Sequence, residues 1–241
     1  MASLYAGELP FCNIESRELM VNLHKPGLVV FDMDSTLITI ECIDEIADLA
    51  GCKPEVSAIT AAAMRGEIDF GQSLLQRVAV LAGVPETALT QIFEPIPFTT
   101  GAFELVRWFQ QLGWKTAVIS GGFTWFAERV QQELGLDAAV ANRLEVENNQ
   151  LTGVVIPPLV DAQAKASHLV RLASQWSIPA EQVIAVGDGA NDIPMLQAAG
   201  LGVAFHAKPT LYPYADLIVK PADLMVLKHQ LVERFGQPLR Q

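Results

Sequence analysis

Residues 28–37, with the sequence LVVFDMDSTL, constrain the fold of this chain more than any other stretch. Four apolar residues run directly into Asp32 and Asp34, two carboxylates separated by one residue. A short apolar run bounded by polar residues is typical of a strand that is buried on both faces of a sheet. The two carboxylates would then stand together at the end of the strand, where a cation or a shared proton has to offset their repulsion.

A simpler interpretation of the same stretch is a helix N-cap. Asp34 or Ser35 would then accept hydrogen bonds from the backbone of a helix that follows. This stretch alone leaves both interpretations open, so the choice between them depends on the rest of the chain.

Strand-like apolar runs alternate with helical patterns over most of the chain. Strands are predicted at residues 115–119, 138–140, 183–186, 201–205 and 217–219. Helices are predicted at residues 101–112, 123–134, 162–175, 192–199 and 224–235. Two further strands, at residues 144–146 and 151–156, are predicted to form a hairpin because Asn148 and Asn149 lie between them. The alternation predicts a Rossmann-like α/β fold, in which helices cover both faces of a parallel sheet.

A purely helical stretch interrupts this alternation directly after the first strand. Apolar residues recur there at helical spacing, and Gly51 and Gly83 mark places where helices would end. Helices are predicted at about residues 43–50, 54–65, 70–81 and 85–93. We therefore predict an N-terminal extension at residues 1–27, an α/β core at residues 28–39 and 99–241, and a helical cap at residues 40–98. A short helix is expected within the extension, at residues 14–23.

Three of the predicted strands end in polar turns. These turns are Asp32-Met33-Asp34, Ser120-Gly121-Gly122 and Gly187-Asp188-Gly189. Each of them alone is explained more simply as an ordinary tight loop. In parallel sheets, however, ligands bind at the carboxyl ends of the strands. An acid pair, a hydroxyl beside two glycines and another acid at one sheet edge together indicate a catalytic site.

The acids in these turns suit phosphate chemistry. Asp32, Asp34 and Asp188 are expected to converge, and Mg²⁺ is usually held by one or two carboxylates together with water and phosphate oxygens. One carboxylate of such a site can attack phosphorus and form an aspartyl-phosphate. Another can protonate the leaving oxygen and then take a proton from water.

Donor and cationic groups for a phosphate follow further along the chain. Residues 120–122 stand just before a predicted helix, where free backbone N–H groups bind anions. Lys165 lies near the start of another predicted helix. A lysine in such a place is usually only solvated, but an acid cluster that handles phosphate favours a role in countering developing charge. Asn191 and Asp192 are either hydrogen-bond partners of the acids or caps of the next helix.

The overall charge and the cysteines limit the possible partners and compartments. The net charge of −11 argues against a general nucleic-acid binder, which needs a basic surface. The three cysteines include no CxxC pair, so neither a disulfide framework nor a zinc site is expected and a reducing compartment is favoured. We see no secretion signal and no run long enough to cross a bilayer. The sequence therefore predicts a cytoplasmic protein that binds neither nucleic acid nor membranes.

These residues resemble the four motifs of the haloacid dehalogenase-like hydrolases. Residues 32–36 resemble the DxDxT signature of that family and Ser120 its second motif; Lys165 resembles the third, and residues 187–192 the fourth. The motifs occur in the family's order between residue 28 and about residue 207. The segment before the first strand, residues 1–27, is too short for the regulatory domain that many bacterial relatives carry there, so none is expected.

The resemblance implies a role for each of these residues. Asp32 would be the nucleophile and Asp34 the general acid and base. Mg²⁺ would be held by Asp32, by Asp188 and by the backbone carbonyl of Asp34. The phosphoryl group would be held by Ser120, Gly121 and Lys165, and Asn191 would help to position it. Independently of the resemblance, the place of Asp192 after Gly189 suggests that it orients the metal ligands.

The predicted cap resembles that of one family within this group, the phosphoserine phosphatases. The resemblance rests on residues 41–47, 63–64, 70, 73–74, 77–78, 120–123 and 141–144. It implies that Glu41 and Arg77 bind the amino and carboxylate groups of the substrate, and that Met64 and Phe70 line the cap side of the pocket. Phosphoserine carries an ammonium and a carboxylate, which a Glu and an Arg would complement. Either charge is otherwise an ordinary feature of a helix surface.

We therefore expect Mg²⁺-dependent hydrolysis of O-phospho-L-serine to L-serine and phosphate, the final step of serine biosynthesis, by a monomer or homodimer. One alternative keeps the fold but acts on another small phosphomonoester such as phosphohomoserine, or transfers the phosphoryl group to an alcohol. Another alternative is an inactive relative that binds a phosphometabolite or a protein partner. Such a relative would be expected to lack at least one of Asp32, Asp34, Lys165 and Asp188, and this chain has all four.

Overall fold

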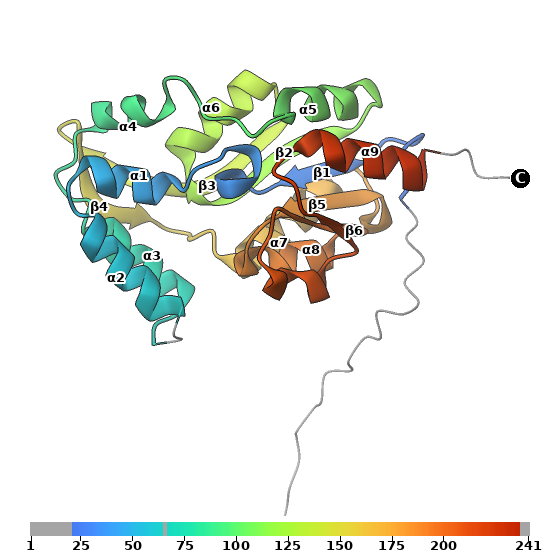
Figure 1. The fold of residues 1–241 in the computed structure, drawn as a ribbon. Helices are drawn as coiled ribbons and strands as arrows, with labels where there is room; N and C mark the ends of the chain where they lie inside the picture. The colour runs from blue at the N-terminus through green and yellow to red at the C-terminus, as the bar shows by residue number, and fades with distance from the viewer. Residues whose placement is uncertain (1–20, 65–66, 237–241) are drawn as a thin grey trace, which may run out of the picture.

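A seven-stranded sheet runs through the computed structural model, which describes residues 21–64 and 67–236 (Figure 1). The strand order is β4-β3-β2-β1-β5-β6-β7, and every neighbouring pair is parallel except β3 and β4. The strands are β1 (Leu28–Phe31), β2 (Lys115–Phe123), β3 (Ala138–Glu147), β4 (Gln150–Ile156), β5 (Val183–Gly187), β6 (Leu201–Phe205) and β7 (Leu217–Val219).

Strand β1 occupies the centre of the sheet because all four of its residues are apolar and completely buried. Val29 and Phe31 pack on one face, against helices α5, α6 and α9. Leu28 and Val30 pack on the other face, against α7 and α8. The five helices are α5 (Ala102–Gln111), α6 (Thr124–Leu134), α7 (Ala162–Gln175), α8 (Ile193–Ala198) and α9 (Leu224–Phe235). The predicted Rossmann-like α/β fold is confirmed.

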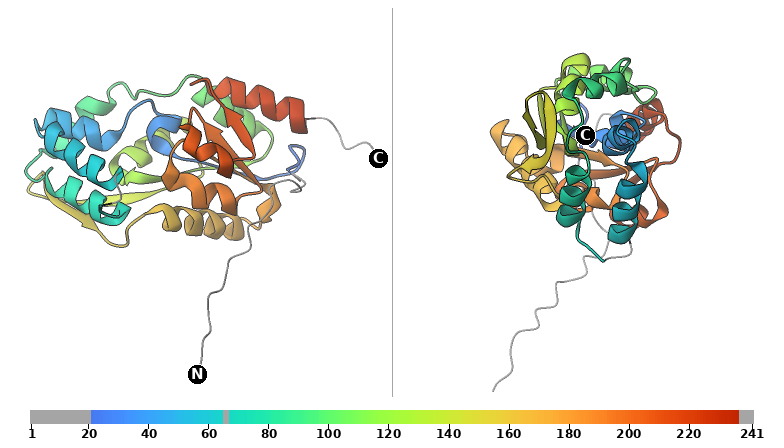
Figure 2. Two further views of the ribbon diagram at one scale, coloured as in Figure 1. Left: turned by 60° about the horizontal axis from the view of Figure 1, so that its bottom comes forward. Right: turned by 90° about the vertical axis from the view of Figure 1, so that its left-hand side faces the viewer.

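Four more helices lie together at one end of the molecule, between β1 and α5 in the chain (Figures 1 and 2). Local sequence defines their ends: Asp69 and Gln72 form a reciprocal capping box at the start of the third helix, and Gly51 follows the first helix with φ 69°. The helices are α1 (Cys42–Leu49), α2 (Lys53–Met64), α3 (Phe70–Ala79) and α4 (Glu86–Phe93). Helices were predicted in these places, while the cap boundaries at residues 40 and 98 stay a prediction.

Backbone hydrogen bonds tie this helical insertion to the sheet. The loop between α3 and α4 pairs with β4: Gly83 N donates to Leu151 O at 2.8 Å, and Leu151 N donates to Val84 O at 2.9 Å. At its two ends the insertion is joined by a bond of 2.9 Å from Thr39 N to Pro97 O. The α3–α4 loop is therefore anchored to the sheet.

Strand β3 corrects the sequence prediction. Residues 138–140 and 144–146 were predicted as separate strands, but they belong to one strand of ten residues, Ala138–Glu147. The polar Asn142 interrupts the apolar pattern, yet its side-chain amide is satisfied by backbone groups of neighbouring segments. The predicted hairpin turn is present, with φ of 52° at Asn148 and 61° at Asn149.

Only residues 21–23 of the helix predicted at residues 14–23 lie within the described part of the chain, and they are not helical. The remainder of that prediction falls outside the described residues. Across residues 21–64 and 67–236, no helix is both long enough and apolar enough to cross a membrane.

Candidate active site

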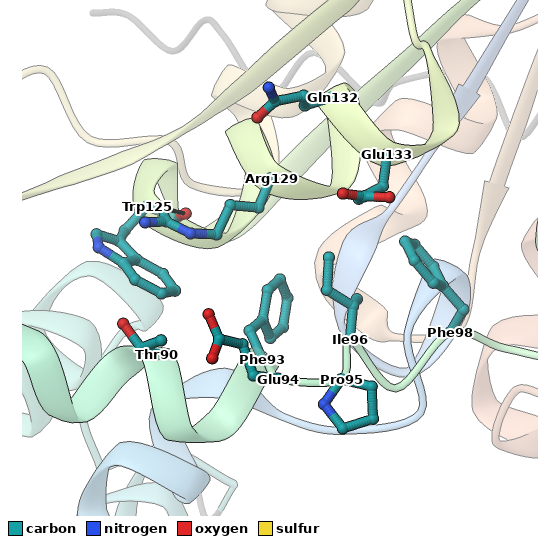
Figure 3. A pocket seen from close by; sticks show the side chains of 10 residues that line it. All are labelled: Thr90, Phe93, Glu94, Pro95, Ile96, Phe98, Trp125, Arg129, Gln132 and Glu133. Carbon is teal, nitrogen blue, oxygen red and sulfur yellow. Dashed lines mark hydrogen bonds between the residues drawn. The ribbon is translucent and has the colours of Figure 1, made fainter.

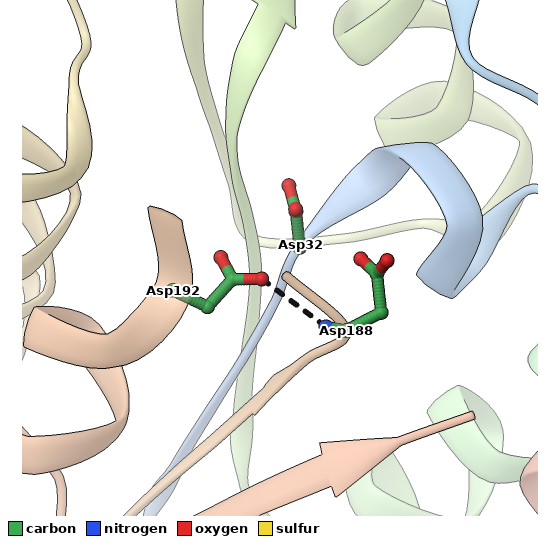
Figure 4. A group of neighbouring side chains, drawn as sticks. All are labelled: Asp32, Asp188 and Asp192. Carbon is green, nitrogen blue, oxygen red and sulfur yellow. Dashed lines mark hydrogen bonds between the residues drawn. The ribbon is translucent and has the colours of Figure 1, made fainter. Parts of the chain in front are cut away.

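The carboxyl ends of three neighbouring strands meet at one edge of the sheet. β1 pairs with β2 on one side and with β5 on the other. Asp32 directly follows β1, Ser120 lies near the end of β2, and Asp188 directly follows β5. Figure 4 shows Asp32, Asp188 and Asp192 as neighbouring side chains. One carboxylate oxygen from each residue lies within 4.8 Å of the others. The topology thus brings together acids that are far apart in the sequence.

Asp32 is enclosed, with only 4% of the residue exposed. Its Oδ1 accepts a hydrogen bond from Met33 N at 2.7 Å and lies 2.9 Å from Lys165 Nζ. Burial raises the pKa of Asp32 well above its ordinary value and the charge of Asp192 raises it further, while Lys165 lowers it. The anionic form of Asp32 therefore depends on positive charge beside it.

Lys165 supplies a completely buried positive charge. Helix α7 begins directly after Asp161, whose Oδ1 accepts a hydrogen bond from Ala164 N at 2.8 Å, so Lys165 stands in the first turns of the helix. Its Nζ donates to Asp192 Oδ1 at 2.5 Å. Burial alone would lower the pKa of Lys165, but the carboxylates of Asp192 and Asp32 raise it well above its ordinary value. The interpretation of Lys165 as an ordinary solvated lysine is wrong.

Asp192 organises the turn that follows β5. Its Oδ2 accepts hydrogen bonds from the backbone N of Asp188 and of Gly189, both at 3.1 Å, while its Oδ1 binds Lys165. A methyl group added to Gly187 would lie 2.4 Å from Asp192 Oδ2, so this packing requires a glycine. Because both of its oxygens already have partners, Asp192 leaves Asp32 and Asp188 as the freer carboxylates of the cluster.

Asp188 is half-buried, and few hydrogen bonds stabilise the negative charge of its carboxylate. Its side-chain partner among the described residues is Thr36, whose Oγ1 donates at 3.4 Å. Burial raises the pKa of Asp188 to about 7, with further contributions from the negative charges of Asp192 and Glu41. Thr36 had no predicted role of its own, and the only sequence signal for it was its place in the DxDxT pattern.

Asp34 lies in the loop that leaves β1, and α1 contacts it from the helical insertion. Its Oδ1 accepts a hydrogen bond from the backbone N of Cys42, the first residue of α1, at 3.1 Å. The Asp34 residue is half-buried. Burial raises its pKa to about 7, together with the charge of Glu41. The turn that follows β1 is capped by Asp32, and not by Asp34, with ψ 137°, or Ser35, with φ 54°. Asp34 does accept a hydrogen bond from the backbone of the later helix α1, as the N-cap interpretation expected, but the N-cap position of α1 is Glu41.

The Ser120–Gly122 segment lies beside Asp34. Ser120 is 1% exposed, and its Oγ accepts a hydrogen bond from Gly122 N at 2.8 Å. A methyl group added to Gly122 would lie 2.7 Å from Asp34 Oδ2, so the two segments are in close contact. The prediction placed these residues just outside a strand, but β2 continues through them and α6 begins at Thr124.

The predicted substrate-binding residues of the insertion lie in α1 and α3 or just before them, apart from Met64. Glu41 directly precedes α1, and its Oε1 accepts a hydrogen bond of 2.6 Å from Ser35 Oγ. Arg77 is half-buried; burial lowers its pKa, while Asp44 and Glu41 act in the opposite direction. Phe70 begins α3, and its Cζ would lie 3.1 Å from a methyl group added to Gly121.

Two predicted residues are less well defined by their contacts. Met64 is the last residue of α2, and its side chain falls outside what the structure describes. Asn191 is half-buried beside Gly189, where a methyl group on that glycine would lie 2.3 Å from Asn191 Oδ1. Its position is adjacent to Asp192 in the turn after β5.

Asn142 had no predicted role, although it belongs to the site's surroundings. It lies in β3, is completely buried, and bonds to the backbone of Gly121 and Val160. The sequence held two signals for it: its place in residues 141–144, on which the family resemblance partly rests, and a polar residue between the two strands predicted at residues 138–140 and 144–146.

A separate pocket of about 590 Å³ lies between α4 and α6 (Figure 3). One wall consists of Trp125 with the guanidinium of Arg129 stacked 3.2 Å from the ring centroid. None of the predicted site residues lines this pocket. The lining residues are Thr90, Phe93, Glu94, Pro95, Ile96, Phe98, Trp125, Arg129, Gln132 and Glu133. The pocket is therefore a different site from the acid cluster of Asp32, Asp188 and Asp192.

Known proteins are similar in sequence to this chain. Residues 29–197 match the model of the haloacid dehalogenase-like hydrolase family. A phosphoserine phosphatase of Idiomarina loihiensis is 59% identical over 202 residues, which cover 84% of this chain and 92% of that protein. A phosphoserine phosphatase of Haemophilus influenzae is 50% identical over 215 residues, which cover 89% of this chain and 68% of that protein.

Solved structures agree with these relatives. A crystal structure of a probable phosphoserine phosphatase from Vibrio cholerae, in an unliganded form, has a TM-score of 0.80 and 45% identity, covering 93% of this chain and 71% of that one. A phospho-aspartyl intermediate analogue of phosphoserine phosphatase has a TM-score of 0.79 and 43% identity, covering 85% and 99%. The chain therefore belongs to the phosphoserine phosphatases, a family of phosphoric monoester hydrolases among the haloacid dehalogenase-like hydrolases.

Proposed function

We propose that this protein hydrolyses O-phospho-L-serine to L-serine and phosphate through an aspartyl-phosphate formed on Asp32. The observation that carries the proposal is the enclosed Asp32 carboxylate at the end of β1, held by Lys165 and facing Asp188. Asp32 Oδ1 has two partners, and its other oxygen has no hydrogen-bond partner among the described residues. A carboxylate held in this way can attack phosphorus without first losing a shell of water.

Lys165 and the Ser120–Gly122 segment would hold the transferred phosphoryl group. Lys165 keeps its positive charge because two carboxylates face it, and it is already fixed before the substrate arrives. Positive and hydrogen-bonding groups that need no rearrangement stabilise the charge of a phosphoryl transition state most effectively. Ser120, Gly121 and Asn191 are assigned the remaining phosphoryl oxygens.

Asp34 would act first as general acid and then as general base. Its pKa of about 7 lets the protonated and ionised forms both be populated near neutral pH. In the first step its proton passes to the leaving serine oxygen. In the second step its carboxylate takes a proton from the water that hydrolyses the aspartyl-phosphate, and Asp32 is restored.

The acid cluster fits the Mg²⁺ that the family implies. The cluster contains three carboxylates, those of Asp32, Asp188 and Asp192, but only one buried ammonium, that of Lys165. The pKa values of Asp32 and Asp188 are raised, because the negative charge of the cluster is not fully balanced. Oxygen ligands of this kind suit Mg²⁺. Asp32, Asp188 and the backbone carbonyl of Asp34 would hold the ion, and the ion would supply positive charge to the phosphoryl oxygens when bound.

Glu41 and Arg77 would select phosphoserine by its two other charges. Glu41 is fixed by Ser35 and lies close enough to the site to raise the pKa of Asp34 and Asp188. No carboxylate within the described ranges lies within ion-pairing distance of the Arg77 guanidinium, which leaves it available to a substrate carboxylate. Met64 and Phe70 are assigned to the wall of the pocket, and residues 40–98 to a cap over the core.

The cellular setting follows from this substrate. We propose that the reaction is the final step of serine biosynthesis in the cytoplasm. The buried Cys42 and the partly exposed Cys52 are free thiols, which is compatible with a reducing compartment. A monomer or homodimer remains the expected state.

Phosphate release from a panel of substrates tests the proposed function. The panel holds phosphoserine, phosphothreonine, phosphohomoserine, a sugar phosphate and an aryl phosphate, each with Mg²⁺ and then with a chelator. The proposal expects the highest kcat/KM for phosphoserine and loss of activity with the chelator. Arg77→Ala should raise KM for phosphoserine far more than for the aryl phosphate.

Higher activity on phosphohomoserine, or transfer to an added alcohol in place of hydrolysis, would favour the alternative within the same fold. No release from any substrate would favour an inactive relative.

A further inference from the structure

Asn142 connects two segments of the site from inside the fold. The residue lies in β3 and is completely buried. Its Nδ2 donates to Gly121 O at 2.8 Å and to Val160 O at 3.3 Å, and its Oδ1 accepts from Val160 N at 2.7 Å. One side chain therefore binds the end of β2 and the segment that precedes α7.

The bond to Gly121 fixes the orientation of one peptide unit. The carbonyl of Gly121 and the N–H of Gly122 belong to the same planar trans peptide, so they point in opposite directions. The carbonyl is held by Asn142, and the N–H donates to Ser120 Oγ at 2.8 Å. The position of Asn142 therefore decides that Ser120 receives this hydrogen bond.

The hydrogen bond from Gly122 determines what Ser120 can do. A serine hydroxyl has one proton to donate and accepts at its lone pairs. Since Ser120 Oγ already accepts from Gly122, its own proton is free for another acceptor, and none of the described residues accepts it. Ser120 is also almost completely buried, so its hydroxyl is directed by the protein and not by bulk water.

The bonds from Asn142 to Val160 help to position Lys165 as well. Val160 is followed by Asp161, which caps α7, and Lys165 stands four residues after Asp161. Because Asn142 holds both backbone groups of Val160, it fixes the segment from which α7 begins. The side-chain amide of Asn142 therefore helps to position both the Ser120–Gly122 segment of β2 and Lys165 of α7.

We infer that Asn142 is a positioning residue for phosphoryl binding, which orients the Gly121–Gly122 peptide so that Ser120 donates its hydroxyl proton to the substrate. This inference rests on the proposed function of the same site. It differs from a purely structural role, in which Asn142 would only join two backbone segments.

Gln182 provides a matched control for that structural role. It is also a buried side-chain amide, 5% exposed, and it makes the same pattern of bonds: it donates to Asn22 O and Lys25 O and accepts from Asn22 N. It lies directly before β5, whereas the acid cluster lies after that strand. Gln182→Ala should therefore lower Tm without changing kcat/KM by more than about twofold.

A double-mutant cycle between Asn142 and Ser120 tests the inference. Asn142→Ala and Ser120→Ala should each lower kcat/KM on phosphoserine by about 10- to 100-fold, as expected when an oriented donor is lost. The double variant should lose little more than the worse single variant, because both changes remove the same donation. Inhibition by inorganic phosphate should also be weaker in each single variant, and only a little weaker still in the double variant. Asn142→Ser, whose hydroxyl can still donate one hydrogen bond, serves if Asn142→Ala fails to fold.

The possible results separate the inference from the proposed function. If the wild-type protein releases no phosphate from phosphomonoesters, the proposed function fails. If the wild type is active and the Asn142 variants lower Tm but keep kcat/KM and phosphate inhibition, Asn142 is only structural and the inference is overturned. Fully additive losses in the double variant would also overturn it, because Asn142 would then act independently of Ser120.

Discussion

Lys165 Nζ lies 2.9 Å from Asp32 Oδ1, and neither side chain has more than 6% of its surface open to solvent. Asp192 binds the same ammonium at 2.5 Å. The lysine is thus paired with two buried carboxylates, one of which is assigned the nucleophilic attack. Removing an ion of such a group leaves uncompensated buried charge.

Lys165→Met is expected to destabilise the protein strongly. The change leaves the carboxylates of Asp32 and Asp192 without a cation, which costs about 3–5 kcal/mol in the free energy of unfolding. Urea unfolding measures this loss. The matched control is Lys115→Met, because Lys115 also pairs with an aspartate, Asp137, at 2.6 Å but has 45% of its side chain exposed. That change is expected to cost about 1 kcal/mol or less, and equal losses would contradict the account.

Gly122→Ala is expected to impair catalysis while leaving the fold intact. The added methyl group would lie 2.7 Å from Asp34 Oδ2 and 3.1 Å from Ser120 Oγ, so one of these groups has to move. A displacement of this size at the acid/base is expected to lower kcat by about 100-fold. Gly71→Ala is the control, because its methyl group would meet neighbours only at 3.4 Å or more. Unchanged kcat in Gly122→Ala would show that the Asp34 position does not matter.

Mg²⁺ is expected to stabilise the protein more at alkaline than at acidic pH. The pKa of Asp188 is raised from 3.8 to about 7, so between these values the folded protein holds a proton that the unfolded chain has lost. The stability of the metal-free protein should therefore fall as the pH rises through this window and level off above it. Binding of Mg²⁺ requires the ionised carboxylate, so the metal offsets this loss only above the window.

Thermal unfolding with and without Mg²⁺ checks this expectation. The rise in Tm should be larger at about pH 8 than at about pH 5, and saturating metal should add about 3 kcal/mol at a hundred times its dissociation constant. Asp188→Asn should abolish the rise, whereas Asp48→Asn, on the exposed side of α1, should keep it. A rise that is unchanged in Asp188→Asn would place the metal elsewhere.

Glu41→Gln is expected to move the pH profile of the reaction. The negative charge of Glu41 helps burial to raise the pKa of Asp34, so its removal should lower that pKa. Protonated Asp34 is required for departure of the leaving group, and the falling limb of kcat/KM should then shift to lower pH. An alkyl phosphate without an amino group is the appropriate substrate, because Glu41 has no ammonium to bind in it. A shift to higher pH, or none, would contradict the coupling between Glu41 and Asp34.

The parts of the fold that the sequence predicted are those in which local pattern and burial agree. Strand β1 is apolar at every position because both faces of the sheet are covered, and α7 was predicted at residues 162–175, where it occurs. The strand ends also followed from topology, since parallel neighbours place Asp32 and Asp188 at the same edge.

What the sequence could not predict depends on partners distant in the chain. Asn142 is a polar residue within β3, and the backbone groups that bond to its buried side chain, at Gly121 and Val160, belong to other segments of the chain. Lys165 is buried because two carboxylates from other segments surround its ammonium, which no pattern in α7 itself reveals. The contact between Asp34 and the backbone of Cys42 likewise arises from how the insertion folds back on the core.

Trapping the phosphoenzyme shows whether Asp32 is the residue that attacks phosphorus. Phosphoserine and Mg²⁺ are mixed with the protein, and the reaction is quenched with acid within one turnover. The protein is then digested, and the masses of the peptides are measured by mass spectrometry. If Asp32 is the nucleophile, one phosphoryl group is added to the peptide that contains Asp32, at the carboxylate of that residue. None is expected in Asp32→Asn, which should also release no phosphate. A phosphoryl group on another residue, or phosphate release by Asp32→Asn at the wild-type rate, would contradict the account.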